Sequence, residues 1–267
     1  MNFSKRFQVK PGQRVKLADF DPDDTAGLNK KEVKDRLEEN VEKLADWQYR
    51  LYAENRRAVL LILQGMDTCG KDGTIAHVTC GLNPQGCRVT SFKQPSSVEQ
   101  EHDFLWRIHR AVPGRGQIGI FNRSHYEDVL IVRVHDLVPK AVWSRRYDQI
   151  NQFEKILAGS DVTVLKFFLY ISKEEQLERL RARLQDPTKL WKFNPDDLKE
   201  RKHWKDYMTA YEDALSRCST KEAPWFIIPA NKKWARNLIV SQILLETLQR
   251  MRPQYPKPTV NPKTIKL

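Results

Sequence analysis

The stretch AVLLILQGMDTCGKDGT, residues 58–74, decides the fold of this 267-residue chain. Its first six residues, Ala58 to Leu63, form an apolar run that is too short to span a membrane and is typical of a strand buried in a parallel sheet. Gly65 to Lys71 then follows the pattern G-x-x-x-x-G-K, in which backbone N–H groups surround a phosphate and the lysine ammonium reaches its outer oxygens. A helix beginning near Lys71 adds its positive N-terminal end. The stretch therefore predicts a strand, a phosphate-binding loop and a helix.

The loop departs from the ordinary nucleotide-binding pattern in its charges. Asp72 stands after the lysine, where most such loops have a Ser or Thr that ligates magnesium. Asp67 lies inside the loop and would repel a bound phosphate unless a divalent cation lay between the two anions, so we expect Asp67 to ligate Mg²⁺. A glycine-rich turn without phosphate is the alternative. The other loop residues expected to contact phosphate or nucleotide are Gly65, Met66, Thr68, Cys69, Gly70, Asp72, Gly73 and Thr74.

Composition limits the classes of protein to which the chain can belong. Forty per cent hydrophobic and 30% charged residues are ordinary for a globular protein. The 46 Lys and Arg against 34 Asp and Glu give a formal charge of +12, which favours a polyanionic partner such as nucleic acid, an acidic membrane surface or a phosphate polymer. We expect a cytoplasmic protein, because the sequence has no membrane-length apolar run and no segment of signal-peptide type. The four cysteines show no metal-site spacing and are interpreted as reduced thiols.

The remaining sequence alternates between strand-like and helix-like patterns. This alternation indicates a single α/β domain at residues 30–252 with a parallel five-stranded sheet flanked by helices, preceded by an irregular arm at 1–29 and followed by a proline-rich tail at 253–267. Strands are predicted at 58–63, 88–92, 117–122, 162–171 and 225–229. Helices are predicted at 30–57, 71–81, 97–112, 139–159, 172–184, 196–217 and 231–251. Ser97 with Gln100 and Ser172 with Glu175 resemble capping boxes, and Pro139 can open the helix that follows it.

A second group of candidate site residues follows the strand at 117–122. Asn122 ends this strand, at the position where P-loop proteins usually have an Asp that supports the metal. An amide can hold a metal-bound water or a phosphate oxygen but brings no charge, so Asp67, with Glu127 or Asp128, must balance the metal's charge. Asn122 is itself a further candidate metal ligand. Glu127 and Asp128 have three alternative roles: a second metal site, selection of the nucleotide, or stabilisation of a helix N-terminus.

A basic segment at about 181–205 is the third candidate. Pro187 and Pro195 interrupt it, and aromatic residues lie among its basic ones. Such a segment between two helices suits a lid that closes over an anion, although a solvated charged loop is the alternative. The basic residues expected to contact the anion are Arg181, Arg183, Lys189 and Lys192.

Taken together, four motifs resemble polyphosphate kinase family 2. They are the loop GMDTCGKDGT, the KQPS at 93–96, the FNRSHYEDVLIVRV at 121–134 and the DPTKLWKF at 186–193. The resemblance covers about residues 30 to 250 and is far more specific than the loop alone. Asn122, with Glu127 and Asp128 after it, is similar to class III of the family, whose members phosphorylate both AMP and ADP.

The resemblance implies a thymidylate-kinase-like core with a helical lid, assembled into homodimers or homotetramers. It implies catalytic roles for Asp67, Lys71, Arg123 and Arg133, phosphate or nucleotide contacts at Lys93, Asn122 and Glu127, and polyphosphate contacts in the lid. Mg²⁺ is the implied cofactor, with Mn²⁺ as a substitute. The implied reaction is reversible phosphoryl transfer from inorganic polyphosphate to AMP and ADP, which gives ADP and ATP.

Three other functions are compatible with parts of the sequence. An ATP-dependent P-loop kinase of a nucleotide or small metabolite would explain the loop and lid but leaves the basic excess unexplained. A nucleic-acid-binding protein would use the basic surface and would lose affinity with salt. A degenerate P-loop scaffold is disfavoured because Asp67, Lys71 and Arg123 are all chemically intact. We therefore expect neither nucleic acid nor a membrane as a partner.

Overall fold

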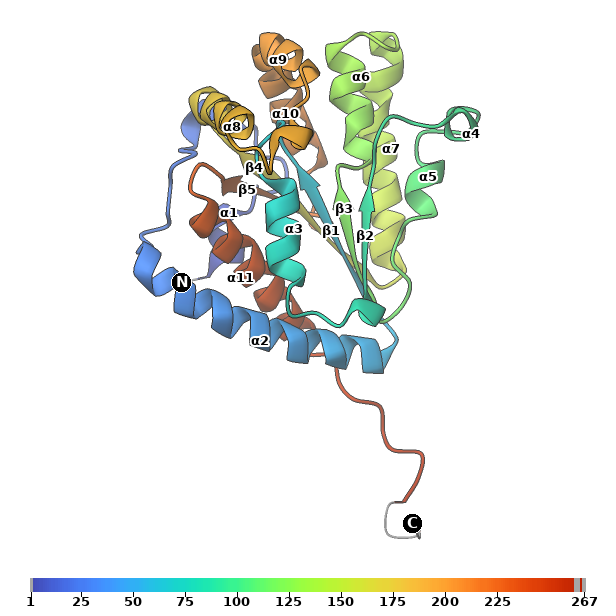
Figure 1. Ribbon diagram of the computed structural model, residues 1–267. Helices are drawn as coiled ribbons and strands as arrows, with labels where there is room; N and C mark the ends of the chain where they lie inside the picture. The colour runs from blue at the N-terminus through green and yellow to red at the C-terminus, as the bar shows by residue number, and fades with distance from the viewer. Residues whose placement is uncertain (1, 262–264, 266–267) are drawn as a thin grey trace.

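The computed structural model describes residues 2–261 and 265, and its centre is a parallel five-stranded sheet (Figure 1). The strands run in the order β2-β3-β1-β4-β5, so β1 lies between β3 and β4 and is buried along its whole length. This arrangement confirms the predicted fold class and explains why the β1 sequence is continuously apolar. The strands are β1 Ala58–Gln64, β2 Cys87–Ser91, β3 Ile118–Asn122, β4 Val162–Tyr170 and β5 Trp225–Pro229.

Helices cover both faces of the sheet and bury two hydrophobic clusters against it. On one face lie α2, which begins after the N-cap Asn29, α3 and α11. On the other face lie α7 and α10. Both faces of the sheet are thereby covered, which leaves the carboxyl ends of the strands free to form a site. The helices are α2 Lys30–Glu54, α3 Lys71–Thr79, α7 Lys140–Gly159, α10 Trp204–Cys218 and α11 Lys233–Met251.

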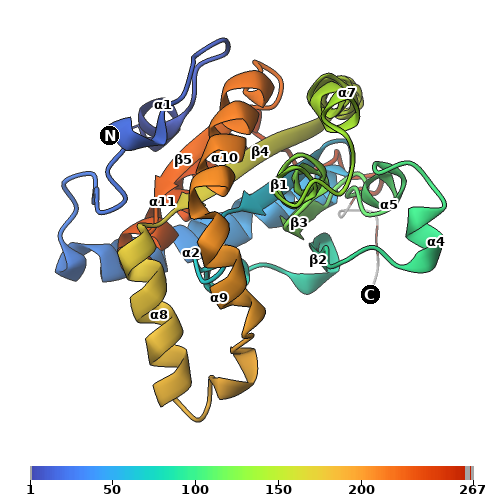
Figure 2. The same cartoon turned by 90° about the horizontal axis from the view of Figure 1, so that it is seen from above.

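The segment expected to form the lid projects from the body as two arms (Figure 2). The first arm is α8, Lys173–Gln185, whose predicted cap is present because Ser172 Oγ accepts a hydrogen bond from the Glu175 amide at 3.1 Å. The second arm is α9, Asp196–Glu200, which continues through a 3-10 helix, Arg201–His203, into α10. A further 3-10 helix, Leu190–Lys192, lies at the tip between the arms.

Two predicted helices are wrong in detail. The helix expected at 97–112 is two short ones, α4 Ser97–Gln100 and α5 Trp106–His109, because Ser96 and Glu99, rather than Ser97 and Gln100, form the capping box and the helix ends after one turn. The helix expected at 196–217 is interrupted by the 3-10 turn that follows α9. The segment after β3, which lies outside the predicted helices, forms a 3-10 helix, His125–Val129, and then α6, Ile131–Val134.

The N-terminal arm packs against the far edge of the sheet. It contains a short helix, α1 Phe3–Phe7, and a 3-10 turn, Leu17–Asp19, where the sequence predicted only irregular structure. Gln8 forms an antiparallel bridge with Phe226 of β5, and the Val9 amide donates to Trp225 O at 2.9 Å. The arm therefore covers the β5 edge, which would otherwise present unpaired backbone groups.

A buried network of charged and polar side chains joins β4 to α7 beneath the segment that follows β3. Lys166 and Glu154 form an ion pair and are both fully buried. Lys166 Nζ also donates to the Tyr126 hydroxyl at 2.9 Å, and His125 Nε2 lies 3.2 Å from Glu154. Burial by itself raises the pKa of Glu154, but Lys166 and His125 hold this pKa below its usual value. The carboxylate is therefore ionised inside the core.

The tail at 253–267 extends partly outside the described residues, since 262–264, 266 and 267 are not among them. Near its start, Arg57 donates to Met251 O at 2.7 Å, and the Tyr255 ring contacts Tyr49 of α2 edge-on at 6.2 Å. Across the described residues, none of the helices has the length and apolar character that crossing a membrane requires. The remaining short element is a 3-10 helix, Pro84–Gly86.

Candidate active site

The loop between β1 and α3 is sharply folded at the carboxyl end of the central strand. Gly65 has a φ of 152°, and a Cβ there would lie 2.7 Å from Leu169 O and 2.8 Å from Cys69 Sγ, so only glycine fits. Lys71 opens α3 and is largely buried, with Nζ donating to Gly65 O at 2.8 Å. The lysine ammonium is therefore held within the curve of the loop, where the G-x-x-x-x-G-K spacing predicts it.

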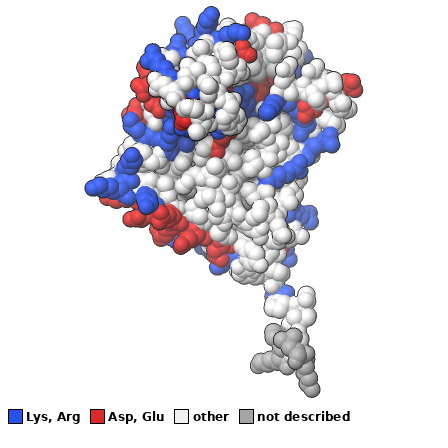
Figure 3. Space-filling model, in the orientation of Figure 1, with Lys and Arg blue, Asp and Glu red and all other residues white. Residues whose placement is uncertain are grey.

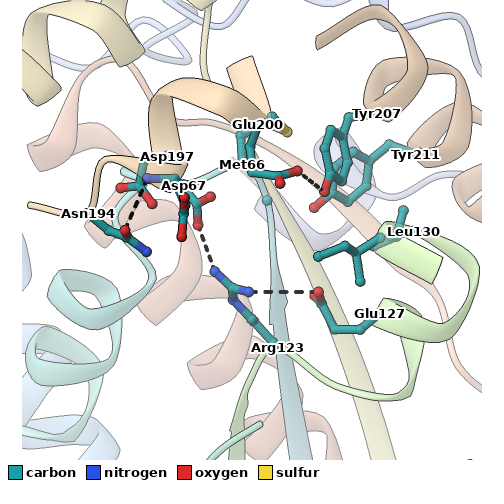
Figure 4. Close-up of a pocket in the computed structure, with 13 residues that line it drawn as sticks. Met66, Asp67, Arg123, Glu127, Leu130, Asn194, Asp197, Glu200, Tyr207 and Tyr211 are labelled. Atoms are coloured by element: carbon teal, nitrogen blue, oxygen red, sulfur yellow. Dashed lines mark hydrogen bonds and ion pairs between the residues drawn. The ribbon is translucent and has the colours of Figure 1, made fainter. Parts of the chain in front are cut away.

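Arg123 lies opposite the loop and pairs with its carboxylate (Figure 4). Its Nη2 donates to Asp67 Oδ1 at 2.7 Å, and its Nη1 lies 3.9 Å from Glu127. Both carboxylates raise the pKa of the Arg123 guanidinium, Glu127 more strongly than Asp67. The backbone of Arg123 is left-handed, with a φ of 64°, and its N–H donates to Leu63 O of β1 at 3.1 Å. This sharp turn after β3 directs the side chain back toward the loop.

A cavity of about 200 Å³ lies between the loop, the segment after β3 and the second lid arm. Glu200 from α9 accepts a hydrogen bond from the Tyr207 hydroxyl at 2.6 Å, and Tyr211 lies beside this pair (Figure 4). One wall is aromatic and aliphatic, whereas the opposite side carries Asp67, Arg123 and Glu127. The lining residues are Gly65, Met66, Asp67, Arg123, Glu127, Leu130, Ile131, Asn194, Asp196, Asp197, Glu200, Tyr207 and Tyr211.

Asp197 brings a second carboxylate toward the loop. Burial, together with the negative charge of Asp67, raises the pKa of Asp197 to about 6, although Arg183, 3.4 Å away, opposes both effects. Asp67 and Asp197 both line the cavity, and two carboxylates in one cavity can serve as a pair of ligands for one cation. The lid therefore adds an acidic residue to a site for which the sequence predicted basic lid residues.

Mg²⁺ fits the donors that the site offers. A magnesium ion in a phosphoryl-transfer site takes one or two carboxylates, several waters and the substrate's phosphate oxygens, and does not need a full set of protein ligands. Asp67 provides one such carboxylate, and Asp197 is the second that faces it. Within residues 2–261 and 265, no group of three or more His, Cys, Asp or Glu side chains forms a larger metal site.

Asn122, the further candidate metal ligand, is engaged by the helix that follows the loop. Its Nδ2 donates to Asp72 Oδ1 at 2.7 Å, which joins the end of β3 to the first turn of α3. Asp72 and Gly73 are exposed, whereas Thr68, Cys69 and Thr74 are buried. The structure therefore places Gly65, Met66 and Asp67 in the cavity wall, but it places Cys69 and Thr74 beneath the loop.

Arg133 does not join the other three residues to which the resemblance gave catalytic roles. Its Nη1 donates to Asp213 at 2.6 Å and to the Tyr147 hydroxyl at 3.1 Å, and its guanidinium lies over the Trp143 ring. On one continuous helix Arg123 and Arg133 would lie about three turns apart, but the break between the 3-10 helix and α6 separates them. Arg133 is therefore outside the cavity lining, and it links α6 to α7 and α10.

Asp128 and the basic residues occupy different surroundings. Asp128 accepts a hydrogen bond from Arg146 at 3.0 Å, and burial raises the pKa of its carboxyl to about 6. Lys93 is exposed at the end of β2, and Arg181 is exposed on α8. In the lid tip, Lys189 pairs with Asp186 and Lys192 lies over the Trp191 ring. None of these basic side chains is among the residues that line the cavity.

Charge is unevenly distributed over the surface (Figure 3). Blue side chains gather around the lid and the opening beside it, whereas red side chains follow α2 at the lower left. The acidic side chains exposed on α2 are Glu32, Asp35, Glu38, Glu39, Glu42 and Asp46. The basic excess is therefore concentrated toward the site end of the molecule, which favours approach of an anion there.

Sequence reasoning did not identify the lid side of the cavity. Asn194, Asp197 and Glu200 were included only in a segment described as basic, and Tyr207 and Tyr211 only in a helix. Tyr207 and Tyr211 are four residues apart on α10, which places both on one helical face, and this spacing was the available signal. Which face meets the loop depends on the path of the chain between α8 and α10.

Known proteins similar to this chain cover nearly all of it. A family model described as polyphosphate kinase 2 matches residues 27–256. An AMP/ADP-polyphosphate phosphotransferase of Meiothermus ruber is 50% identical over 256 residues, which are 95% of this chain and 96% of the relative. An ADP-polyphosphate phosphotransferase of Rhodopseudomonas palustris is 47% identical over 269 residues, covering 96% of this chain and 93% of that one. The crystal structure of a polyphosphate kinase 2 from Arthrobacter aurescens superposes with a TM-score of 0.94 at 44% identity, covering 98% of this chain and 94% of that one.

Proposed function

Since this chain belongs to the polyphosphate kinase 2 family, we propose that it transfers a terminal phosphoryl group from inorganic polyphosphate to AMP and to ADP, and that the reaction runs in both directions. The observation that carries the proposal is the pairing of Asp67 and Arg123, 2.7 Å apart on the polar side of one cavity, at the mouth of the phosphate loop. An anion bound by the loop and a second anion bound in the cavity would meet at this pair.

The chemistry requires positioning and charge stabilisation more than proton transfer. An oxygen of the acceptor's phosphate attacks the terminal phosphorus, the bridging P–O bond breaks, and the shortened polymer leaves with the bridging oxygen. The attacking oxygen is already anionic at neutral pH, so no general base is needed. Lys71 and the loop amides would hold the donor phosphates, and Arg123 would balance the charge of the moving group from the other side.

We propose Mg²⁺ as the cofactor, held by Asp67, with Asp197 as a further ligand when the lid closes and Asn122 as a predicted contact. When bound, the ion supplies charge neutralisation between the two anionic substrates. Arg123, now paired with Asp67, would then be free to turn its guanidinium to the phosphoryl group. Mn²⁺ would substitute because it also accepts carboxylate, phosphate and water oxygens.

The apolar wall of the cavity suits the base of the acceptor nucleotide. Leu130 from the segment after β3 lies beside Tyr207 and Tyr211 from α10, and Ile131 lines the same cavity. A planar base stacks favourably on aromatic rings. Glu127 and Glu200, at the edges of this wall, offer acceptor oxygens for an exocyclic amine.

Product analysis tests the proposal directly. The protein is mixed with Mg²⁺, polyphosphate and either AMP or ADP, without ATP, and the nucleotides are separated by chromatography. The proposal expects ADP and ATP from AMP, and ATP from ADP. ATP-dependent phosphorylation of another acceptor, with no product from polyphosphate, would instead support the rival kinase. If single-stranded DNA displaces polyphosphate from the protein, that result would support the nucleic-acid alternative.

The homodimeric or homotetrameric state and the cytoplasmic location remain predictions. Light scattering coupled to size-exclusion chromatography measures the first, since a dimer of this 31.4 kDa chain is readily distinguished from a tetramer.

A further inference from the structure

Three consecutive carbonyl groups of the phosphate loop are held by buried side chains from behind the loop. Asp67 O accepts from Gln176 Nε2 at 3.0 Å, and Thr68 O accepts from Arg179 Nη1 at 3.0 Å. Cys69 O accepts from two arginines, Arg179 Nη1 at 3.0 Å and Arg236 Nη1 at 2.9 Å. The three donor side chains are 1%, 8% and 2% exposed, so water does not compete for these hydrogen bonds.

This arrangement fixes the direction in which the loop amides point. The C=O and N–H of a trans peptide point to opposite sides of the chain, so holding the carbonyls of residues 67 and 69 toward α8 and α11 turns the Thr68 and Gly70 N–H groups the other way. The amide between them, of Cys69, bonds internally to Met66 O at 3.1 Å. N–H groups aimed to one side of such a loop form an anion-binding nest.

The loop conformation needs these contacts, because it is unfavourable by itself. Thr68 has a φ of 65°, which a β-branched residue rarely adopts. Gly70 has a φ of 103°, and a Cβ there would lie 1.9 Å from Arg236 Nη1. The arginine therefore occupies the space against Gly70. Backbone in such regions persists where its surroundings over-determine it, as three side-chain donors do here.

Arg236 is an uncompensated charge beneath the loop. Its other donors, Nε and Nη2, bond to Asn237 Oδ1 at 3.1 and 2.8 Å, and no acidic side chain in the described part of the chain pairs with it. Burial lowers its pKa to about 10, which leaves it cationic at neutral pH. Arg179 is instead shared, since its Nε bonds to Glu175 and its Nη2 to Ala230 O and Asn231 O of the segment after β5.

Gln176 connects this set to the lid. While its Nε2 donates to Asp67 O of the loop, its Oε1 accepts from Arg201 Nη1 of the second lid arm at 2.8 Å. Arg201 also donates to Lys173 O at the start of α8. Movement of the second arm therefore acts directly on the side chain that holds the first of the three carbonyls.

We propose that Gln176, Arg179 and Arg236 are positioning residues for the donor phosphate chain: they orient the loop amides toward it, and Gln176 links that orientation to the lid. The proposal rests on the proposed function only in naming polyphosphate as the anion. None of the three is placed to touch the reacting atoms, and they act through the loop backbone.

The test compares Arg236→Met and Arg236→Lys with Arg250→Met, an exposed arginine on the same helix. Steady-state kinetics are measured with polyphosphate and AMP varied separately. Arg236→Met is expected to raise the KM for polyphosphate by about tenfold or more while the KM for AMP changes less than about threefold, as loss of an oriented charged donor set on one substrate predicts. Arg236→Lys should recover most of the polyphosphate KM, because an ammonium can still donate to Cys69 O, and Arg250→Met should match the wild type.

An unchanged polyphosphate KM in folded Arg236→Met, an equal rise in both KM values, or no recovery by lysine would each overturn the proposal. If Arg236→Met does not fold, Gln176→Met serves instead, since it keeps the side-chain volume and removes only a neutral donor. It is expected to raise the polyphosphate KM by about threefold or more, again with little change for AMP. No selective rise in Gln176→Met would overturn the proposal equally.

A binding measurement separates failure of this inference from failure of the proposed function. Thermal unfolding is followed with and without Mg²⁺ and inorganic tripolyphosphate. If the wild type fails to use polyphosphate as a donor, the proposed function is wrong, but the loop inference is still decided by this shift. Loss of the stabilising shift in Arg236→Met, with the shift kept in Arg250→Met, supports it, and equal shifts in both overturn it.

Discussion

Lys71 and Asp67 lie in one loop with opposite charges, and they act differently in the proposed reaction: Lys71 holds the donor phosphates, and Asp67 holds the cation between the two anions. Lys71 Nζ lies within the loop, bonded to Gly65 O, whereas Asp67 faces the cavity and Arg123. Removing either charge would leave the fold but not the electrostatic balance that lets two phosphates approach.

We therefore expect Lys71→Met and Asp67→Asn each to lower turnover by more than about a hundredfold, as loss of a charge-stabilising group typically does. Both replacements keep the side-chain volume close to the original. The measurement is initial rates of ATP formation from ADP and polyphosphate, with circular dichroism to confirm the fold. Lys155→Met, an exposed lysine on α7, is the matched control. Near-normal turnover in either site variant would remove that residue from the mechanism.

Asp197 makes stability depend on pH in a direction that can be measured. Its folded pKa of about 6 lies above its unfolded value of 3.8, so its contribution to stability is fully present below about pH 4 and is lost as the pH rises through 6. The amide of the Asp197→Asn variant cannot ionise, so the variant does not lose this stability as the pH rises. The Tm of the variant minus that of the wild type should therefore be larger at pH 7.5 than at pH 4.5. Each kcal/mol of difference in unfolding free energy corresponds to about 2–4 °C in Tm.

The adjacent Asp196 is the control for this measurement. Its side chain is 63% exposed and pairs with Lys199 at 2.7 Å, so Asp196→Asn should give a Tm difference with little pH dependence. If the Tm difference between Asp197→Asn and the wild type does not change with pH, the surroundings of Asp197 do not raise its pKa.

At the scale of elements, β4 and α7 are joined by charges that a hydrophobic core does not ordinarily contain. Lys166→Met would leave the Glu154 carboxylate buried without its cation, and we expect a loss of about 3–5 kcal/mol in the free energy of unfolding. Lys166→Met with Glu154→Leu removes both charges and should recover about half of that loss or more. Urea unfolding measures both, with Lys155→Met as a control within about 0.5 kcal/mol of the wild type. A double variant no more stable than Lys166→Met would contradict this account.

The sequence predicted elements well where one physical signal dominated. The apolar run at 58–63, the proline before α7 and the Ser172 cap each define an element that the structure contains. The prediction of one helix from 97 to 112 was wrong, because the capping box at Ser96 predicts where a helix begins but not that it ends after one turn.

Some residues of the candidate site could likewise be predicted from the sequence, and others could not. Asp67, Lys71 and Arg123 follow directly from strands, and parallel strands bring their carboxyl ends to one edge of a sheet, so sequence order was enough to place them together. Asp197, Glu200 and Tyr207 reach the same cavity from a lid whose path is set by turns at 186–203. Periodicity carries no information about such turns, and a lysine-rich composition concealed the acidic residues that face inward.

At the scale of the whole molecule, the N-terminal arm determines whether the sheet has one open edge or two. Glu246 of α11 accepts from the Phe3 and Ser4 amides at 3.0 and 2.9 Å and so fixes the start of α1, while Phe3 and Phe7 are buried. β2, at the other end of the sheet, is largely exposed.

We expect deletion of residues 1–9 to lower the Tm and to promote association. Two phenylalanines lose burial worth about 1.5–3 kcal/mol each, and β5 becomes an unpaired edge. Differential scanning fluorimetry and light scattering at several protein concentrations measure the two effects. Lys5→Ala, an exposed change within the same arm, should alter neither. A truncated chain with the wild-type Tm and mass would show that the arm is dispensable.

The arm can dock only late in the synthesis of the chain. Residues 3–9 are made early, but their partners, Trp225, Phe226 and Glu246, leave the ribosome more than 200 residues later. At roughly 5–20 residues per second, the arm waits about ten seconds or longer before its contacts exist. Phe3 and Phe7 therefore remain exposed until β5 and α11 have been synthesised. A nascent chain stalled before β5 should be bound by holdase chaperones, which should release the complete chain.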